Sequence, residues 1–325
     1  MLVTFLGTGS GAPSTKRNVS ATAVTFRSSG KWWLFDCGEG TQHQLLHSPL
    51  KVSQLEKIFI THLHGDHLFG LLGLLASRSL SARVETPINV YGPAGLKQYV
   101  QAVMAASPMH ISYPLDFHTI EPGIVLETDA LTVTCAPVMH RVPCFAYAIE
   151  EKPSPGKFQV EKAKMLGVPP GPLFGALKRG ERVVLPDGRE IDGCALSGPS
   201  QPGRKVVLSG DTIPCEAVVK LAEGASLLIH EATYAHAHLE LAVRSAHSTA
   251  RQAAEVAKTA GVKQLILTHL SPRYDSGDDD LNTETLLAEA QELFPHTLVA
   301  ADFWQYEVKR SHAIMEHYDT SEGTE

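Results

Sequence analysis

The stretch of sequence that decides the fold is EKIFITHLHGDH, residues 56–67. Its apolar first half predicts a β-strand over Lys57–Thr61, because β-branched and aromatic residues favour extended structure. Its second half places four potential metal ligands within six residues: His62, His64, Asp66 and His67. One histidine alone is usually a structural residue. Four such side chains directly after a strand indicate a metal site, because imidazole and carboxylate groups bind zinc and similar ions.

Local geometry divides these four residues between two ions. His62 and His64 stand two apart at the end of an extended segment, so both can point to one face. Gly65 allows the backbone to turn, and Asp66 and His67 can then face a second ion. The hexapeptide therefore predicts the beginnings of two adjacent metal sites.

Further strand-like runs along the chain end in the same kinds of side chain. His140 follows LTVTCAPVM, Asp211 follows KVVLSG and His269 follows KQLILT. Each is weak evidence alone, but a rigid sheet can hold the loops at its strand ends in place. Together with the hexapeptide they supply five histidines and two aspartates, enough for two ions with Asp211 between them. Paired ions stabilise both the attacking and the leaving oxygen of a displacement, so we expect a two-metal hydrolase.

Two more polar residues are candidates for proton transfer. Glu231 ends the run SLLIHE, and His247 precedes a predicted helix over 248–261, with Ser248 as its N-cap. A histidine held by a carboxylate is a suitable proton donor to a leaving oxygen. We expect His247 to be this donor and Glu231 to orient it. Asp66 is expected to accept a proton from the attacking water besides binding an ion.

Composition is that of an α/β globular protein with a sizeable core. The chain has 325 residues, of which 43% are hydrophobic and 19% charged. No run approaches the roughly 18 apolar residues of a membrane helix, and the N-terminus lacks a secretory pattern, so we expect no membrane partner and a cytoplasmic location. Five scattered cysteines form no C-x-x-C pair and predict free thiols. The formal charge of −7 argues against a protein that coats nucleic acid non-specifically, so any nucleic-acid site would be confined to one region of the surface.

Residues 151–195 differ from the chain on either side. They are rich in proline and glycine and show no convincing strand alternation; between Lys152 and Arg189 they hold eight Lys or Arg against three acidic residues. A basic, proline-stiffened segment in an acidic protein predicts an inserted arm. The alternative is a surface loop that binds no partner. We therefore expect one catalytic domain formed by residues 1–150 and 196–325.

These motifs together resemble the metallo-β-lactamase superfamily, whose H-x-H-x-D-H motif stands at residues 62–67. More specifically, the sequence is similar to the short-form ribonuclease Z family through FLGTGSG, LFDCGEGTQHQL, PPGP, HEAT at 230–233 and AHST at 246–249. The resemblance implies an αββα sandwich and a homodimer that binds precursor tRNA. It implies removal of the 3′ trailer, leaving a 3′-hydroxyl on the tRNA and a 5′-phosphate on the trailer. It also implies that residues 151–195 form a flexible arm that grips the tRNA body.

The resemblance further implies two zinc ions in each subunit, although spacing alone does not separate zinc from manganese or iron. The ligands it implies are His62, His64 and His140 for the first ion, Asp66, His67 and His269 for the second, and Asp211 as the bridge. One loop departs from the family pattern P-x-K-x-R-N. Residues 13–18 read PSTKRN, so the lysine is displaced by one position, and the resemblance does not imply how this chain selects the cleavage site near a CCA end.

Two alternatives remain open. A hydrolase of the same fold could act on another small ester or phosphodiester, because this fold serves many chemistries. The chain could instead be a catalytically silent tRNA-binding subunit, but such a protein would be expected to have lost some of the seven ligands.

Overall fold

The computed structural model describes residues 1–27, 29–81, 85–154, 156–198, 200–275 and 282–310, which form two compact units. The first unit consists of Met1–Glu150 and Arg204–Lys309. The second consists of Glu151–Gly203 together with Arg310. Among the described helices, none combines the length and the apolar character needed to cross a bilayer.

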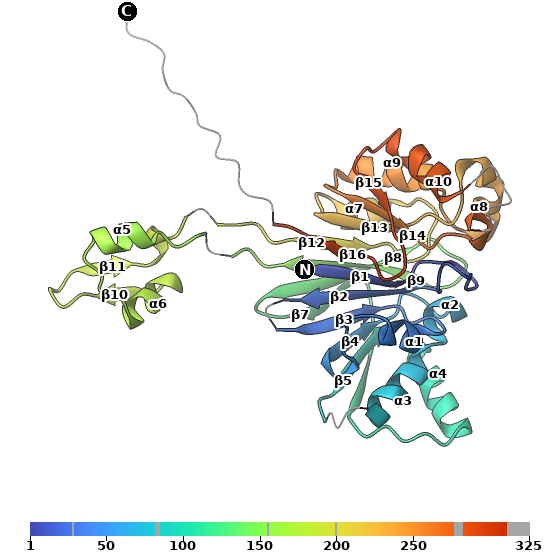
Figure 1. The fold of residues 1–325 in the computed structure, drawn as a ribbon, viewed down its shortest axis with the longest axis horizontal. Coiled ribbons are helices and arrows are strands. Elements are labelled where there is room, and N and C mark those ends of the chain that lie inside the picture. Colours follow the sequence, from blue (N-terminus) through green and yellow to red (C-terminus); the bar gives the residue numbers. More distant parts are fainter. Residues whose placement is uncertain (28, 82–84, 155, 199, 276–281, 311–325) are drawn as a thin grey trace, which may run out of the picture. The chain divides into compact units, whose positions relative to one another are not determined.

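Two seven-stranded sheets form the middle of the first unit (Figure 1). The first sheet contains, in spatial order, β16 (Gln305–Glu307), β1 (Leu2–Gly7), β2 (Ala21–Phe26), β3 (Lys31–Phe35), β4 (Leu55–Phe59), β5 (Ile88–Gly92) and β6 (Leu115–Thr119). The second contains β15 (Thr297–Val299), β14 (Leu265–Thr268), β13 (Leu227–Glu231), β12 (Lys205–Leu208), β9 (Cys144–Glu151), β8 (Leu131–Val138) and β7 (Gly123–Glu127). Both sheets are mixed: β3 to β6 run parallel, as do β12 to β15.

Helices cover the outer face of each sheet, which makes this unit an αββα sandwich (Figure 1). Beside the first sheet lie α1 (Thr41–Leu46), α2 (Gly65–Leu68), α3 (Leu71–Ser81) and α4 (Leu96–Ala106). Beside the second lie α7 (Glu216–Ala222), α8 (Leu239–Ser245), α9 (Ala250–Ala260) and α10 (Thr283–Gln291). Single 3₁₀ turns are found at Val52–Gln54, Cys194–Leu196, His236–His238 and Pro272–Tyr274. The predicted α/β sandwich is confirmed.

Apolar side chains fill both faces of each sheet, because successive residues of a strand point to opposite sides. On β4, Ile58 packs under the helices, whereas Phe59 packs between the two sheets. Phe59 stacks on Phe35 of the neighbouring strand with ring centroids 4.8 Å apart. Truncating such a buried aromatic residue to alanine costs about 3–5 kcal/mol. The strand ends that carry the polar site are therefore fixed from both sides.

Helix α9 shows how closely the sequence predicts a local boundary. The helix ends at Gly261, which adopts φ 62°, a conformation that favours glycine. It begins with a capping box in which the side chain of Thr249 accepts a hydrogen bond from the amide of Gln252. The predicted N-cap, Ser248, is therefore wrong by one residue. Its hydroxyl instead donates to the carbonyl of Thr212, 2.7 Å away, beside the polar site.

The second unit is a small folded element with its own apolar core. It contains α5 (Val160–Met165), α6 (Pro172–Lys178) and an antiparallel hairpin of β10 (Arg182–Val184) and β11 (Glu190–Asp192). Its core consists of Ala163, Val168, Leu177, Val183, Leu185, Ile191 and Leu196. The sequence of this segment shows no convincing strand alternation, yet the structure forms a hairpin there. Val183 and Ile191 pair across the hairpin and are buried, but strands of three residues are too short to show alternation in the sequence.

Candidate metal centre

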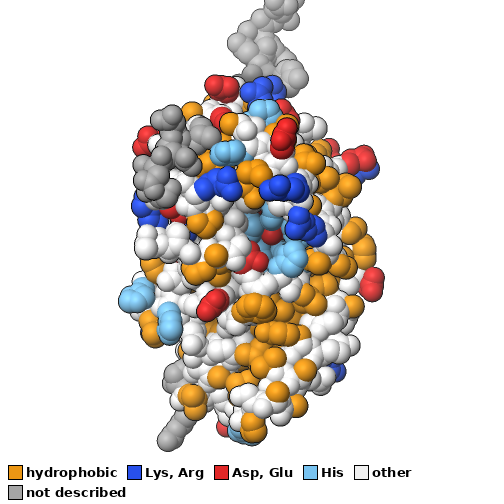
Figure 2. Space-filling view, turned by 90° about the vertical axis from the view of Figure 1, so that its right-hand side faces the viewer, with side chains coloured by type: hydrophobic (Ala, Val, Ile, Leu, Met, Phe, Trp, Pro, Cys, Tyr) orange, Lys and Arg blue, Asp and Glu red, His pale blue; other side chains and the backbone are white. Residues whose placement is uncertain are grey.

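The polar site lies where strands of both sheets end. From the first sheet, β3 leads to Asp36 and β4 leads to residues 62–67. From the second sheet, β8, β12, β13 and β14 lead to His140, Asp211, Glu231 and His269 respectively. Figure 2 shows a hollow on this face, with histidine and acidic side chains inside it and Lys and Arg side chains along one side. The structure thus brings all seven predicted ligands to one place.

The first group of donor atoms comes from three histidines. Nδ1 of His64 lies 3.1 Å from Nε2 of His62 and 3.2 Å from Nε2 of His140. All three nitrogens lie within 4.8 Å of one another. His62 is fully buried, and the other two are half-buried at the edge of the hollow. This group could hold one ion with imidazole nitrogens.

The second group mixes two histidines with two carboxylates. Nε2 of His67 lies 3.1 Å from Nε2 of His269, which in turn lies 3.3 Å from Oδ2 of Asp66. Oδ2 of Asp211 lies 3.3 Å from each of the same two nitrogens. Apart from Asp66, the members of this group are buried. The four donors can surround a second ion.

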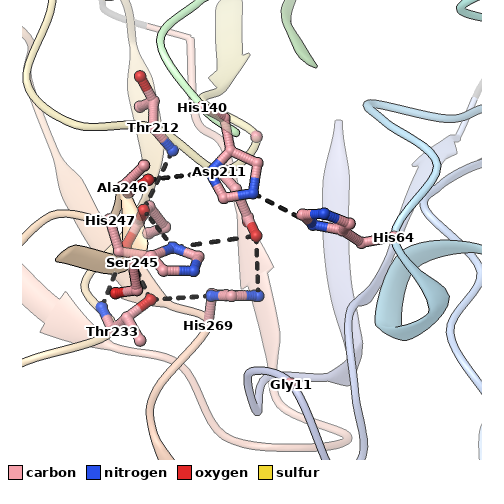
Figure 3. Close-up of polar contacts among 12 residues, drawn as sticks. Gly11, His64, His140, Asp211, Thr212, Thr233, Ser245, Ala246, His247 and His269 are labelled. Atoms are coloured by element: carbon pink, nitrogen blue, oxygen red, sulfur yellow. Dashed lines mark hydrogen bonds and ion pairs between the residues drawn. The ribbon is translucent and has the colours of Figure 1, made fainter. Parts of the chain in front are cut away.

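Asp211 lies between the two groups. Besides its contacts in the second group, its Oδ2 lies 3.7 Å from Nε2 of His62 in the first. Figure 3 shows Asp211 with His140, His247 and His269 on the side of the second sheet, and His64 approaching from the opposite side. A carboxylate in this position can be shared by two ions, as the sequence predicts.

Hydrogen bonds on the outer side of the rings determine which nitrogen faces the centre. Nδ1 of His140 faces the carbonyl oxygen of Ala246 at 2.9 Å, so this nitrogen must carry the proton. Nδ1 of His67 likewise donates to Oδ2 of Asp36 at 2.8 Å. In both residues Nε2 is left with a lone pair directed into the cluster, which is the usual arrangement of histidine ligands.

Two threonine hydroxyls fix two more histidines in the same way. Thr61 donates its hydroxyl proton to Asp36, so its oxygen can only accept from Nδ1 of His62, 2.9 Å away. Thr233 donates to Glu231 at 2.8 Å and accepts from Nδ1 of His269 at 2.9 Å. Four Nε2 lone pairs therefore converge beside carboxylate oxygens. Lone pairs this close together repel one another unless a cation, either a proton or a metal ion, lies between them, so the donor set fits metal ions.

The electrostatics of the two groups differ. In the first, burial and the neighbouring charge of His67 lower the pKa of His62 to about 2. Burial also lowers the pKa of His64 and His140, so all three imidazoles stay neutral. In the second, burial opposes charge on His67, yet Asp211 and Asp36 raise its pKa well above the ordinary value. The carboxylate-rich half thus attracts positive charge, whether carried by a proton or by a metal ion.

His247 and Glu231 form a pair beside the cluster. Nδ1 of His247 lies 2.8 Å from Oε1 of Glu231, which is completely buried. Glu231 is held in turn by the amides of Thr212 and Thr233, both at 3.1 Å. Burial opposes the charged form of His247, but the carboxylate of Glu231 outweighs it and raises the pKa to about 9. At neutral pH this imidazole is therefore protonated and can donate a proton.

Sequence reasoning missed the residues that orient the histidines, Asp36 above all. Asp36 follows β3 directly, so it stands at a strand end like the predicted ligands, and this signal was available. It accepts from His67 and from both the amide and the hydroxyl of Thr61. Its φ of 59° is uncommon for a residue with a side chain, which is typical of positions held by their surroundings. For Thr61 and Thr233 no comparable sequence signal exists.

Curated relatives match this chain over almost its whole length. A ribonuclease Z of Brevibacillus brevis is 61% identical over 310 residues, which cover 95% of this chain and 98% of the relative. A ribonuclease Z of Gloeothece citriformis is 53% identical over 310 residues, covering 95% and 97%. Because the matches span 310 residues, they include the second unit as well as the sandwich.

Solved structures show a similarity to the same kind of protein. The short form of human tRNase Z is 30% identical, with a TM-score of 0.68 and coverage of 95% of this chain and 100% of the human one. YhfI of Bacillus subtilis, a metallo-β-lactamase fold protein, has a TM-score of 0.65 at 19% identity, which speaks for the fold alone. A family model described as the anti-Pycsar protein Apyc1 matches residues 1–152. That match ends where the second unit begins and covers less than half of the chain.

Proposed function

This chain belongs to the ribonuclease Z family, and from that premise we propose how its residues act on tRNA. The protein is a metal-dependent endoribonuclease that processes the 3′ end of tRNA. The observation that carries the mechanism is the convergence of seven donor side chains, with four histidine lone pairs directed inward. We infer that the substrate is a precursor tRNA and that the products are a tRNA with a 3′-hydroxyl and a trailer with a 5′-phosphate.

The proposed cofactor is a pair of zinc ions in each subunit. The residues that would hold the ions are His62, His64 and His140 in the first group, Asp66, His67 and His269 in the second, and Asp211 in both. A donor set rich in neutral imidazole favours zinc over magnesium or calcium, which prefer oxygen ligands. When bound, such ions make water a stronger nucleophile and stabilise charge on phosphoryl oxygens.

The chain's own residues would manage the protons. His247 would donate a proton to the departing 3′ oxygen of the tRNA, and Glu231 would keep it charged and oriented. Burial would raise the pKa of Asp66, but the close contacts of its carboxylate with the imidazoles of His269 and His67 lower it below the ordinary value. A carboxylate held in its charged form suits ligation better than proton acceptance. We therefore retain Asp66 as a ligand and regard its role as proton acceptor as the weaker expectation.

One experiment tests the reaction and the cofactor together. Purified protein is assayed on a precursor tRNA, metal content is measured on the same preparation, and the ends of both products are determined. We expect close to two zinc ions per chain and a 5′-phosphate on the trailer. A 2′,3′-cyclic phosphate on the tRNA would contradict the mechanism, because an attacking water does not use the ribose 2′-hydroxyl. Metal content well under one ion per chain, with tRNA still bound, would favour a silent binding subunit instead.

We propose that the second unit binds the body of the tRNA. Between Lys152 and Arg189 it carries eight basic residues, which suits a polyanion. Four of these basic residues, however, pair with acidic residues of the same unit: Lys164 with Glu161, Arg179 with Glu181, Arg182 with Asp192 and Arg189 with Asp187. All four pairs are solvent-exposed, so such pairs contribute little and can be exchanged for phosphates.

We also propose a homodimer in the cytoplasm. Leu46 of α1 and Leu80 of α3 are 80% and 89% exposed. Both line a groove of 420 Å³ on the helical face of the first sheet, which offers an apolar surface to a second copy. All five cysteines are free, as expected in a reducing compartment. A mass measurement in solution tests the dimer: Leu46→Glu should shift the protein towards the monomer, and a monomeric parent protein would refute the proposal.

A further inference from the structure

The loop from Thr8 to Asn18 carries two neighbouring basic residues with opposite environments. Lys16 is exposed, whereas Arg17 is 8% exposed. Both lie within the PSTKRN segment, where a basic residue near an RNA-cleaving site would ordinarily be taken for a phosphate contact. The guanidinium of Arg17 is directed into the protein, so it requires a different explanation.

Arg17 joins its own loop to two distant segments. Its Nε lies 3.2 Å from Oδ1 of Asp275, whose other oxygen accepts from the hydroxyl of Ser14 at 2.8 Å. Its Nη1 donates to the hydroxyl of Thr8 and to the carbonyl of Ala300, both at 2.7 Å. These bonds engage Nε and Nη1 within the protein, and the burial of the side chain keeps the guanidinium from solvent.

The same loop is bonded to the segment that follows His269. The amide of Ser10 donates to the carbonyl of Leu270 at 3.0 Å, and the amide of Leu270 donates to the carbonyl of Thr8 at 2.9 Å. Asp302 anchors both ends of the loop, accepting from the hydroxyl of Thr8 and from the amide of Asn18, each at 2.7 Å. These bonds hold the loop in one place relative to the metal centre. Gly11 of this loop is labelled in Figure 3.

Where this loop reaches the centre, it contacts a proposed ligand through its backbone. The amide of Gly11 donates to Oδ2 of Asp66 at 2.7 Å. That same oxygen lies 3.3 Å from Nε2 of His269. Gly11 adopts φ +70°, a conformation that other residues reach only with strain, and this directs its N–H towards the carboxylate. The hydrogen bond fixes the orientation of the carboxylate, with Oδ2 facing the histidines.

We propose that Arg17 is a positioning residue for Asp66 rather than an RNA contact. By tying the loop to Asp275 and Ala300, it keeps the Gly11 amide on Oδ2 of Asp66 and so keeps that oxygen among the donors of the second group. This inference rests on the proposed role of Asp66 as a metal ligand. Groups that orient metal ligands typically affect metal affinity or activity by 10- to 100-fold when removed.

The test compares Arg17→Gln with Lys16→Gln, its exposed neighbour in the same loop. For each variant, kcat and KM are measured on precursor tRNA, and retention of each metal equivalent is measured by competition with a chelator. We expect Arg17→Gln to lower kcat about tenfold or more with KM within about twofold, and to weaken retention of one equivalent. Lys16→Gln should leave kcat and both metal affinities unchanged. A raised KM with unchanged kcat and metal retention in Arg17→Gln would overturn the proposal.

A second variant guards against loss of folding. Asp275→Asn keeps an oxygen that can accept from Arg17 but removes the charge, so it should show the same pattern more weakly. The double variant should be no worse than Arg17→Gln alone, because both changes break one connection. Independent, additive effects would contradict the proposal.

Asp66→Ala separates this inference from the proposed function. If Asp66→Ala keeps both metal equivalents and full cleavage, the ligand assignment itself fails. If Asp66→Ala loses them while Arg17→Gln and Asp275→Asn behave as the parent protein, only the role of Arg17 fails.

Discussion

Charged side chains are buried at the metal centre but exposed to solvent in the second unit. At the centre, Asp36, Asp211 and Glu231 are less than 10% exposed, and each is held by several hydrogen bonds or close histidines. In the second unit the ion pairs lie in solvent; the side chains of Arg179 and Glu181 are 65% and 52% exposed. Buried polar networks specify one arrangement and tolerate no missing partner. Surface pairs contribute little and can be exchanged.

In the proposed function, this difference separates chemistry at the centre from substrate binding by the second unit. A reaction requires donors fixed within fractions of an ångström, so it belongs where each ring is fixed from outside. Holding a large polyanion requires charges that can move to meet phosphates, so it suits an exposed unit. Substitutions at the centre should therefore change turnover, and removal of the second unit should change the affinity for tRNA.

The largest effect should come from removing a buried ligand. His67→Ala takes one donor from the second group and leaves the buried Asp36 with Thr61 as its remaining hydrogen-bond donor among the described residues. Metal ions contribute several kcal/mol to catalysis, so cleavage should fall by roughly a thousandfold or more. Binding of precursor tRNA, measured by filter retention, should stay within about threefold. Cleavage near the parent rate would show that the reaction does not depend on the buried donors of the metal centre.

His247→Ala should come next. It removes the proposed proton donor while leaving all seven ligands in place, so kcat should fall by roughly 10²- to 10⁴-fold with metal content unchanged. The matched control is His236→Ala, an exposed histidine on a neighbouring 3₁₀ turn, which should behave as the parent. Equal losses in both variants would argue for a general disturbance rather than a lost proton donor.

Glu231→Gln should produce a smaller change with a characteristic pH dependence. The donor is the protonated form of His247, whose pKa is raised to about 9, so kcat should fall as the pH rises through that value. Because the amide no longer favours the charged imidazole, the fall should begin at lower pH. At neutral pH the loss should be about 10- to 100-fold, typical of an orienting group. A pH profile identical to that of the parent would show that Glu231 does not set this pKa.

The smallest effect on chemistry should come from excising the second unit. Backbone bonds of 3.0 and 2.9 Å join Ser154 to Gln201, so residues 155–200 can be replaced by a short Gly-Ser linker. We expect KM for precursor tRNA to rise about tenfold or more, equivalent to about 1.4 kcal/mol. Hydrolysis of a small nitrophenyl phosphodiester should be unchanged. Unaltered tRNA affinity would refute the second unit as a tRNA-binding element, and a lost small-molecule activity would refute its independence from the centre.

The polar residues of the centre could be predicted from the sequence because each follows a local pattern, whereas the αββα sandwich was implied by the resemblance to a known family. A buried strand followed by His or Asp can be read from a few neighbouring residues, as at KVVLSGD or KQLILTH. The partners that orient the ligands depend on distant pairings. His67 and Asp36 are 31 positions apart, and their hydrogen bond exists only because β3 and β4 run side by side. The burial of Arg17 cannot be predicted from the sequence for the same reason, since its partners lie 258 and 283 positions away.

The donors of this centre come from both sheets of the sandwich, with residues 62–67 on one side and His140, Asp211 and His269 on the other. An ion coordinated there is consequently also a crosslink between the two halves of the fold. Ligands that bind only the native state raise its stability in proportion to the logarithm of their concentration over Kd. Metal supply in the cell would then govern how long each molecule survives as well as how fast it turns over.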